Sequence, residues 1–327
     1  ILLPRIEALL IIFKELFMRA NVVAVLRAVP LLSLLVLGLA ASVQAQDTLT
    51  IKHAQGETQV PKLPKTVAVL DWSTLDTLAA LGVEAQGIPQ SNILPPMLEQ
   101  YADARFVRVG TLFEPDYEAL QNLKPDLIIL GRRAASEYQE VANYGPTLDL
   151  TPDPSDMVGS VVRNTEILGQ IFDREAQAAE LTAKLKASVE QLQALSAEQG
   201  TGLTLLTSGG KMSAFGVGTR FGMINDVFGV EPAVADLKVG RHGQAVSYEF
   251  LLEANPDWLF VMDRDAAIGR EGVAAQQMMD NELVQATNAG AKEQIVYLEP
   301  VSWYLLDNSG LRVLQDNVDQ LTQVFAK

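Results

Sequence analysis

The chain has 327 residues, and its 40 acidic and 25 basic side chains give a formal net charge of −15. A surface this acidic repels nucleic acid and anionic lipid, so neither is an expected partner. Cysteine is absent, which excludes disulfides, thiolate metal sites, a catalytic thiol and a lipidated cysteine. The length suits two domains of ordinary size.

Residues 1–45 have the pattern of sequence that precedes a mature protein. Arg19 and Arg27 form a positive region around the start of an apolar segment, and small residues lead to an expected cleavage site after Ala45. Met18 is the expected start of translation. A membrane anchor is the alternative, but the apolar run is shorter than the ~20 residues of a membrane span. We therefore expect a signal peptide and export to a periplasm, without lipidation.

The region from residue 46 to about 150 alternates strand and helix signals, which predicts a parallel sheet. In chain order we expect a hairpin over 48–60, a strand over 66–70, helices over 74–81 and 92–101, and an extended segment over 105–110.

The stretch 117–133 continues this order. Its helix is ended by Pro125, because the residue before a proline avoids the α region. The apolar run 127–130 then suits a strand covered on both faces. Arg132 and Arg133 stand beyond the C-terminal end of this strand, where α/β folds place ligands.

The stretch 248–264 repeats that order, with Tyr-Glu, Leu, Pro-Asp, an apolar run and then Arg264. Helix, Pro-Asp and strand form a common connection, so two copies can coincide by chance. The other interpretation is two similar αβ lobes, each of which presents an arginine beyond a strand.

Between residues 156 and 199 the strand signals vanish and two helices are expected, the second capped by Asp173. A helical connection of this length is unlike a flexible linker and would limit lobe closure to small angles. We therefore predict an N-terminal αβ lobe over 46–173, a connecting helix over 174–198 and a C-terminal αβ lobe over 199–327.

After these helices a strand is expected over 202–207, followed by a glycine-rich passage that ends at Gly222. The glycine spacing misses the dinucleotide fingerprint, so these glycines are expected to let the backbone approach a ligand while Arg220 projects. The last expected elements are a strand over 294–298, a loop over 299–308 and a helix over 310–325.

Three arginines, Arg132, Arg220 and Arg264, thus lie in loops beyond strands. Any one alone would be an ordinary surface charge, but their recurrence in an acidic chain favours an anion site, which the bidentate guanidinium suits. His242 and Tyr304 are individually ordinary as a loop residue and a packing residue. Together they could complete a metal's coordination with one nitrogen and one phenolate.

Hydrolytic chemistry has little support in the sequence. A nucleophilic serine needs a histidine base, and no G-x-S-x-G elbow or paired-carboxylate signature stands out. The chain has two histidines, which are also too few for a bare zinc or manganese carrier.

Several motifs together carry a family resemblance: K-T-V-A-V-L-D, L-K-P-D-L-I-I-L-G-R, G-T-R-F-G, V-G-R-H-G, N-P-D-W-L-F-V-M-D-R and S-W-Y-L. In their order and spacing, from about residue 47 to the C-terminus, the chain resembles the periplasmic iron-siderophore-binding proteins of ABC importers. The most similar branch carries ferric catecholates of the enterobactin and petrobactin type. This family has two αβ lobes joined by a rigid helix, with the ligand in a shallow cleft between them.

The resemblance implies roles for individual residues. Arg132, Arg220 and Arg264 would form a triad that meets the trianionic ferric tris-catecholate. His242 and Tyr304 would ligate iron directly when the siderophore supplies only four donor atoms.

Further positions receive a role from the same resemblance. Glu118 and Glu249, one per lobe, match acidic residues that dock on arginines of the membrane permease. Arg133 adds a charge beside Arg132, which leaves open which of the two points into the cleft. Trp72 replaces a smaller aromatic after the first strand, so it would belong to the ligand site and change the shape of the cleft.

Together these observations favour a monomeric binding protein that has neither catalytic activity nor a permanently bound cofactor. Its ligand would be an Fe(III)–siderophore complex of the catecholate type, delivered to an ABC importer permease in the inner membrane for iron uptake. A haem or corrinoid carrier of the same fold is the alternative, with Tyr304 and His242 as axial ligands. Three arginines suit a trianion better than two propionates. A secreted α/β enzyme is the third and least favoured interpretation.

Overall fold

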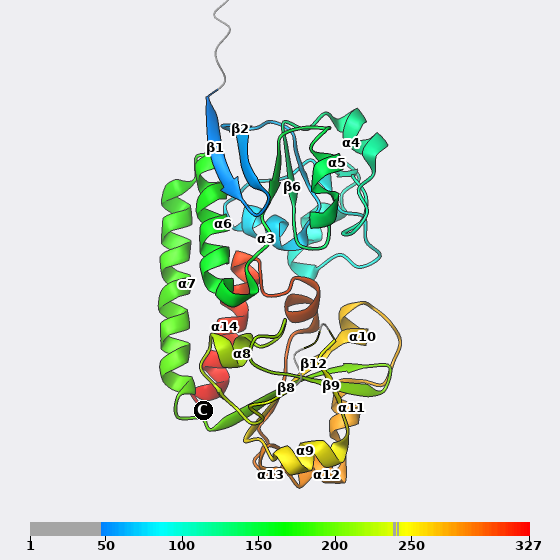
Figure 1. Cartoon of the computed structure of the whole chain (residues 1–327), viewed down its shortest axis with the longest axis vertical. Helices are drawn as coiled ribbons and strands as arrows, with labels where there is room; N and C mark the ends of the chain where they lie inside the picture. The colour runs from blue at the N-terminus through cyan, green and yellow to red at the C-terminus, as the bar shows by residue number, and fades with distance from the viewer. Residues whose placement is uncertain (1–46, 238–239, 241) are drawn as a thin grey trace, which may run out of the picture. The chain divides into compact units, whose positions relative to one another are not determined.

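The computed structural model describes residues 47–237, 240 and 242–327 (Figure 1). The predicted signal peptide and the start at Met18 lie outside the described residues. Within those residues no helix combines the length and the apolar character needed to cross a bilayer. The chain from Asp47 onward clusters as one compact unit.

The N-terminal sheet has five parallel strands in the order β5-β4-β3-β6-β7. Its strands are β3 (Val67–Val69), β4 (Gly87–Ile88), β5 (Val107–Arg108), β6 (Leu127–Leu130) and β7 (Thr147–Asp149). The hairpin of β1 (Thr48–His53) and β2 (Gly56–Pro61) lies beside β7, where the Thr58 hydroxyl donates to the Thr147 carbonyl at 3.0 Å. The predicted hairpin and parallel sheet are confirmed.

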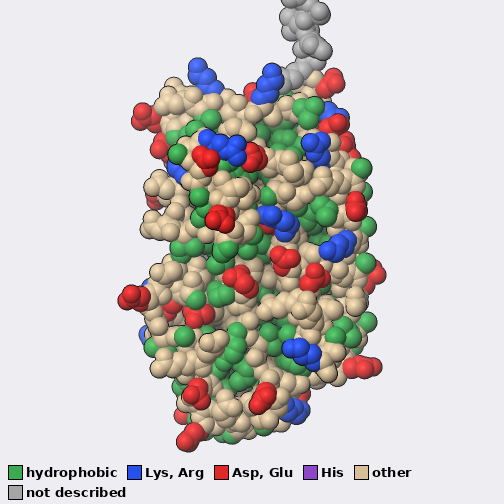
Figure 2. Space-filling view, turned by 180° about the vertical axis from the view of Figure 1, so that it is seen from behind, with side chains coloured by type: hydrophobic (Ala, Val, Ile, Leu, Met, Phe, Trp, Pro, Cys, Tyr) green, Lys and Arg blue, Asp and Glu red, His purple; other side chains and the backbone are tan. Residues whose placement is uncertain are grey.

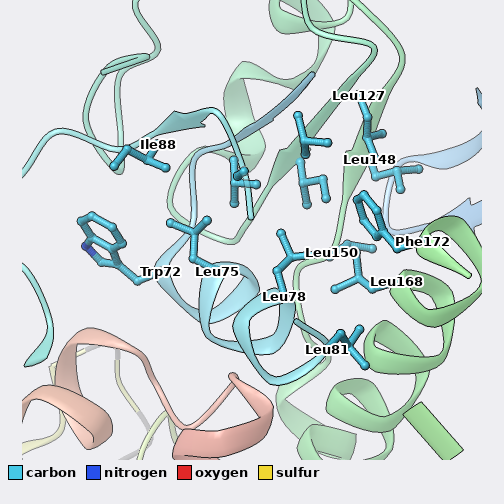
Figure 3. Packing of buried hydrophobic residues seen from close by; sticks show 14 of the residues in the cluster. Trp72, Leu75, Leu78, Leu81, Ile88, Leu127, Leu148, Leu150, Leu168 and Phe172 are labelled. Carbon is cyan, nitrogen blue, oxygen red and sulfur yellow. The ribbon is translucent and has the colours of Figure 1, made fainter. Parts of the chain in front are cut away.

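Short helices connect these strands: α3 (Trp72–Ala80), the 3₁₀ segment η1 (Pro96–Ala102), α4 (Tyr117–Leu123), η2 (Ala135–Glu137) and α5 (Tyr138–Val141). The helix predicted over 92–101 is thus a later 3₁₀ segment. Leu75 and Leu78 of α3, spaced to share one helical face, belong to one buried cluster with Ile88, Leu127 and Leu148 (Figure 3).

Two long helices follow η3 (Pro154–Asp156): α6 (Met157–Phe172) and α7 (Glu175–Ser196), which pack against each other, while α14 (Leu311–Phe325) packs on α7 (Figure 1). The prediction that Asp173 caps the second helix is wrong. Asp173 ends α6 in the left-handed conformation, with φ 57°, and its N–H donates to the Gly169 carbonyl. The residue before α7 is Arg174, whose side chain makes no capping bond.

The C-terminal sheet is mixed, with the order β11-β9-β8-β12-β13 and β10 paired with β8. Its strands are β8 (Thr201–Ser208), β9 (Lys211–Phe215), β10 (Glu231–Pro232), β11 (Gln244–Val246), β12 (Trp258–Asp263) and β13 (Ile295–Tyr297). β10, β12 and β13 join as parallel strands and β9 and β11 as antiparallel ones. The predicted αβ character of this lobe is therefore confirmed, with an antiparallel edge.

The helices of this lobe are short: α8 (Met223–Asp226), α9 (Tyr248–Ala254), α10 (Arg264–Ala267), α11 (Ala275–Met279), α12 (Glu282–Gln285) and α13 (Asn288–Ala291). The predicted loop over 299–308 contains a π-helical turn, η4 (Val301–Leu305). The fold class predicted from the sequence is confirmed, whereas the lobe boundaries at 173 and 198 stay a prediction.

A second connection between the two sheets runs through α3 and α14. The Asp76 carboxylate, which is fully buried, accepts bonds from the backbone N–H of Arg312 at 2.9 Å and of Val313 at 3.2 Å, and from Arg312 Nε at 2.9 Å. Burial raises the pKa of Asp76, and the Arg312 charge opposes that rise. An aspartate of the N-terminal lobe thus supplies the helix cap that α14 lacks in its own sequence.

Candidate anion-binding site

The first part of the site is the turn after β6. Asp71 caps α3 by accepting bonds from the Thr74 N–H at 2.8 Å and the Thr74 hydroxyl at 2.9 Å. Gly131 lies so close to this carboxyl that a Cβ there would collide with it. The glycine therefore lets the Arg132-Arg133 turn approach the start of α3. Burial raises the pKa of Asp71, against the effect of its bonds to Thr74 and of the Arg133 charge.

Asp307 is the point on which three arginines converge. Its Oδ2 accepts a bond from Arg132 Nη2 and lies 3.3 Å from Arg133 Nη2, and its Oδ1 accepts bonds from Arg220 Nη2 and, at 2.8 Å, from Arg220 Nε. Only 9% of the Asp307 side chain is exposed. One nearly buried carboxylate thus holds guanidinium groups from both lobes, in the charge-assisted geometry that arginine favours.

Tyr304 is the second contact shared by the arginines. Its carbonyl oxygen accepts bonds from Arg220 Nη2 at 2.9 Å and from Arg133 Nη2 at 3.4 Å, and its hydroxyl accepts a bond from Arg264 Nε at 2.7 Å. The guanidinium carbons of Arg220 and Arg264 lie 4.9 and 5.5 Å from the centre of its ring. The ring face therefore adds cation–π attraction to the hydrogen bonds.

The four arginines carry more charge than the acids beside them compensate. Arg264 Nη1 lies 4.0 Å from Asp265 Oδ1, the limit of an ion pair. Between 16% and 39% of each arginine side chain is exposed, with Arg132 the most open and Arg133 the least. The cavity lined by Arg132, Arg133 and Arg220 has a volume of about 30 Å³, which is room for water. A large ligand must therefore meet the arginines from their exposed side.

The arginine cluster is assembled from segments far apart in the sequence. On the face shown in Figure 2, basic side chains are interspersed with acidic ones. The arginines of the cluster instead come together from distant parts of the chain, since Arg132 and Arg220 are 175 and 87 positions from Asp307. The sequence predicted arginines beyond strands, but it gave no role to Asp307 or Asp71. The one local signal was an acid within the S-W-Y-L-L-D-N segment.

Two other predicted ligand residues, Trp72 and His242, form no side-chain hydrogen bond with these arginines within the described residues. Trp72 is only 1% exposed and packs in the N-terminal core (Figure 3). Its indole N–H has no hydrogen-bond partner among the described residues. The helix that Trp72 begins thus turns the ring inward, and the role of Trp72 in the ligand site stays a prediction. His242 is exposed, and within the described part of the chain no hydrogen bond or ring contact is found between it and Tyr304.

The two glutamates predicted to dock on a permease lie at equivalent places. Glu118 is in the first turn of α4 and Glu249 in the first turn of α9, and both are exposed. A hydrogen bond from the Ser247 side chain lowers the pKa of Glu249. Both carboxylates also suit the positive end of the helix dipole.

Comparison with known proteins assigns the chain to a family. Residues 67–301 match the model of a family described as periplasmic binding protein. The chain belongs to the periplasmic binding protein family. This membership confirms the predicted family and the prediction of a binding protein in place of an enzyme. The secreted-enzyme interpretation is therefore wrong.

Members of the periplasmic binding protein family with described ligands are among its relatives. The chain is 38% identical over 287 residues to the petrobactin-binding protein YclQ of Bacillus subtilis, covering 86% of this chain and 90% of that one. The crystal structure of YclQ superposes with a TM-score of 0.81 over 86% of this chain and 99% of its own. The ferric-anguibactin-binding protein FatB of Vibrio anguillarum is 30% identical, covering 84% and 87% of the two chains. The catecholate-siderophore-binding protein VctP of Vibrio cholerae, 28% identical, has a TM-score of 0.79 over 86% of this chain and 99% of its own.

Proposed function

We propose that this protein captures a ferric siderophore of the catecholate type and delivers it to an ABC importer permease for iron uptake. The observation that carries the proposal is the convergence of arginines from both lobes on the segment 304–307. In a chain of net charge −15, these side chains retain an excess of positive charge. An anionic chelate seated on their exposed side would compensate it. YclQ, FatB and VctP are named for binding petrobactin, ferric anguibactin and a catecholate siderophore, which supports a ferric siderophore as the ligand.

The proposal extends to place and partners. The protein would reach a periplasm by its signal peptide, act there as a soluble monomer and carry no cofactor between rounds of transport. Glu118 and Glu249, exposed and one per lobe, would meet one permease subunit each. Membership of a family of periplasmic binding proteins supports this arrangement.

The arginines provide the main test. Arg220→Ala or Arg264→Ala should weaken the binding of a ferric tris-catecholate by about tenfold to a hundredfold, since each charged hydrogen bond contributes ~1.5–3 kcal/mol. Fluorescence quenching measures the affinity, and the absorption spectrum distinguishes the broad bands of iron catecholate from the Soret band of haem. Arg105→Ala is the matched control, because Arg105 is 57% exposed and pairs with Glu84. Unchanged affinity in both cluster variants would contradict an anion site.

His242 and Tyr304 receive a separate proposal: direct ligation of iron when the siderophore has four donor atoms. A hexadentate siderophore fills the coordination sphere of iron and needs neither side chain. A tetradentate one leaves two positions, which an imidazole and a phenolate can occupy. The double variant His242→Ala/Tyr304→Phe should therefore lose the tetradentate complex and keep most of its hexadentate affinity. Equal losses for the two ligands would assign both residues a structural role.

A further inference from the structure

Asp307 is held in an unusual backbone conformation. Asp307 and Asn308 have φ values of 53° and 56°, two consecutive residues in the left-handed region. Glycine adopts this region freely, and aspartate and asparagine are the other residues that tolerate it. A carboxylate therefore stands at a position where the backbone alone would favour glycine, so its charge is the property that calls for explanation.

The segment around Asp307 is fixed on both sides. On one side the Leu306 carbonyl accepts bonds from the Ser73 hydroxyl at 2.7 Å and the Ser309 hydroxyl at 2.9 Å. On the other, the Asn308 side chain accepts a bond from the buried Asn317 of α14. Its neighbours are thus anchored to α3 and α14, and the Asp307 carboxylate itself is nearly buried against the arginines.

This placement has an electrostatic consequence for any anion at the site. Asp307 binds the same guanidinium groups from the inner side that a ligand meets from the exposed side. Its negative charge cancels part of the field of the arginines and repels an incoming anion. Coulomb repulsion scales with the charge of the ligand, so Asp307 penalises a trianion about three times as strongly as a monoanion.

We infer that Asp307 sets the charge selectivity of this site, lowering its preference for highly charged ferric chelates over those of lower charge. The inference rests on the proposed function, since it concerns the ligand class of the same site. It assigns a specificity-determining role to a residue that touches the arginines and lies behind the surface the ligand would meet.

The test compares the full chain with Asp307→Asn, which keeps the size and backbone tolerance of the side chain and removes its charge. Affinities are measured at one low salt concentration for the Fe(III) complexes of a hexadentate tris-catecholate, a trianion, and a tetradentate bis-catecholate, a monoanion. The variant should bind the trianion about tenfold to a hundredfold more tightly and the monoanion about two- to fivefold more tightly. Equal changes for both ligands, or a loss of affinity for both, would overturn the inference.

Asp173→Asn is the matched control. Asp173 also has a left-handed backbone, with φ 57°, and pairs with Lys62 at 3.2 Å, away from the arginine cluster. This substitution removes the same charge and should leave the ratio of the two affinities unchanged. If Asp307→Asn fails to fold, Asp307→Gly makes the same comparison with the residue that best suits the backbone.

A second measurement separates this inference from the proposed function. Without siderophore, Asp307→Asn leaves the cluster without its carboxylate, so its melting temperature should rise with sodium sulfate more steeply than that of Asp173→Asn at equal ionic strength. If the wild type binds neither ferric catecholate but this sulfate dependence is found, the proposed ligand is wrong and the charge role of Asp307 stands. Parallel sulfate curves for the two variants would overturn the charge role itself.

Discussion

The two copies of the helix–Pro-Asp–strand unit, 117–133 and 248–264, form the same local structure, and each is preceded by a capping residue. α4 begins at a cap in which Asp116 accepts a bond from the Ala119 N–H at 2.9 Å, and α9 begins with the Ser247 side chain as its cap. Both helices end on a residue in the left-handed conformation, Lys124 with φ 51° and Asn255 with φ 41°. A strand of the parallel part of each sheet then follows.

The aspartate of the Pro-Asp pair accepts hydrogen bonds from the neighbouring strand in both copies. The Asp126 carboxylate accepts bonds at 2.9 Å from the backbone N–H groups of Lys65 and Thr66, just before the neighbouring strand β3. The Asp257 carboxylate accepts a bond at 3.1 Å from the N–H of Thr201, the first residue of the neighbouring strand β8. Each aspartate thus ties its own strand to the start of the strand beside it.

The copies differ in what their arginines contact beyond the strands. Arg132 and Arg133 reach the Asp307 carboxylate, whereas Arg264 donates to the hydroxyl of Tyr304. Both acceptors belong to the single segment 304–307. The repeated unit therefore positions Arg132, Arg133 and Arg264, and the segment 304–307 offers a carboxylate to one copy and a hydroxyl to the other.

The largest expected effect concerns Glu118 and Glu249, which occupy equivalent positions in the two copies and lie outside the arginine cluster. Glu118→Ala/Glu249→Ala should reduce uptake through the cognate permease to background while siderophore affinity and melting temperature stay nearly unchanged. The reason is that charges at the rim of an interface fix orientation and association more than the stability of either partner. Transport is measured in vesicles reconstituted with the permease.

The control for this prediction is Glu114→Ala/Glu253→Ala, which removes one exposed glutamate near each docking position. It should transport normally. Normal transport by the Glu118/Glu249 variant would instead leave both glutamates with only a weak interaction with the helix dipole. Partial rescue of Glu-to-Lys variants by arginine-to-glutamate changes on the permease would locate the contact.

The next effect concerns the two Pro-Asp aspartates. Asp126→Ala and Asp257→Ala should each lower the free energy of unfolding by about 1–3 kcal/mol, because the first leaves two backbone N–H groups and the second leaves one without an acceptor at a strand start. Urea denaturation measures the change, with Glu190→Ala on the exposed face of α7 as a control near zero. A loss in one variant alone would show that the two units are similar in form and unequal in energy.

A smaller effect is the energetic coupling of each arginine to Asp307, which should differ between Arg132 and Arg264. In double-mutant cycles on the ligand-free protein, Arg132→Ala should couple to Asp307→Asn by about 0.5–2 kcal/mol, reduced by the 39% exposure of Arg132. Arg264→Ala should couple to Tyr304→Phe and be nearly additive with Asp307→Asn. Strong coupling of Arg264 to Asp307 would mean that the cluster acts as one network without the division described above.

Local patterns explain why the repeated units could be predicted. The strand over 127–130 has the bounds expected from its apolar run, and Pro125 and the residue before it end the helix as expected. Asp173 shows the limit of such patterns, because an aspartate between two helices can begin one or end the other. The Asp307 contacts lay beyond sequence reasoning, since their partners are 87 to 175 positions away.

The burial of Trp72 shows a different limit. The sequence placed it correctly after the first strand, yet the direction of its ring depends on how α3 packs against the rest of the N-terminal core. No property of the neighbouring residues in sequence fixes that direction. The same holds for His242, whose loop brings it to the surface with no described contact to Tyr304.

The smallest effect is a pH dependence carried by one copy. Two hydrogen bonds lower the pKa of Asp257: the one from the Thr201 N–H has the larger effect, and the one from the Lys292 ammonium has the smaller. A carboxyl whose pKa is lower in the folded than in the unfolded chain contributes stability above the unfolded pKa, about 3.9, and loses it as the pH falls through the folded value. The stability difference between the wild type and Asp257→Ala should therefore be constant from pH 7 to about 5 and shrink in more acidic solution. Urea denaturation at successive pH values measures it, with Glu190→Ala as the baseline. A difference that stays constant down to pH 3 would show that Asp257 acts through packing, without a contribution from its charge.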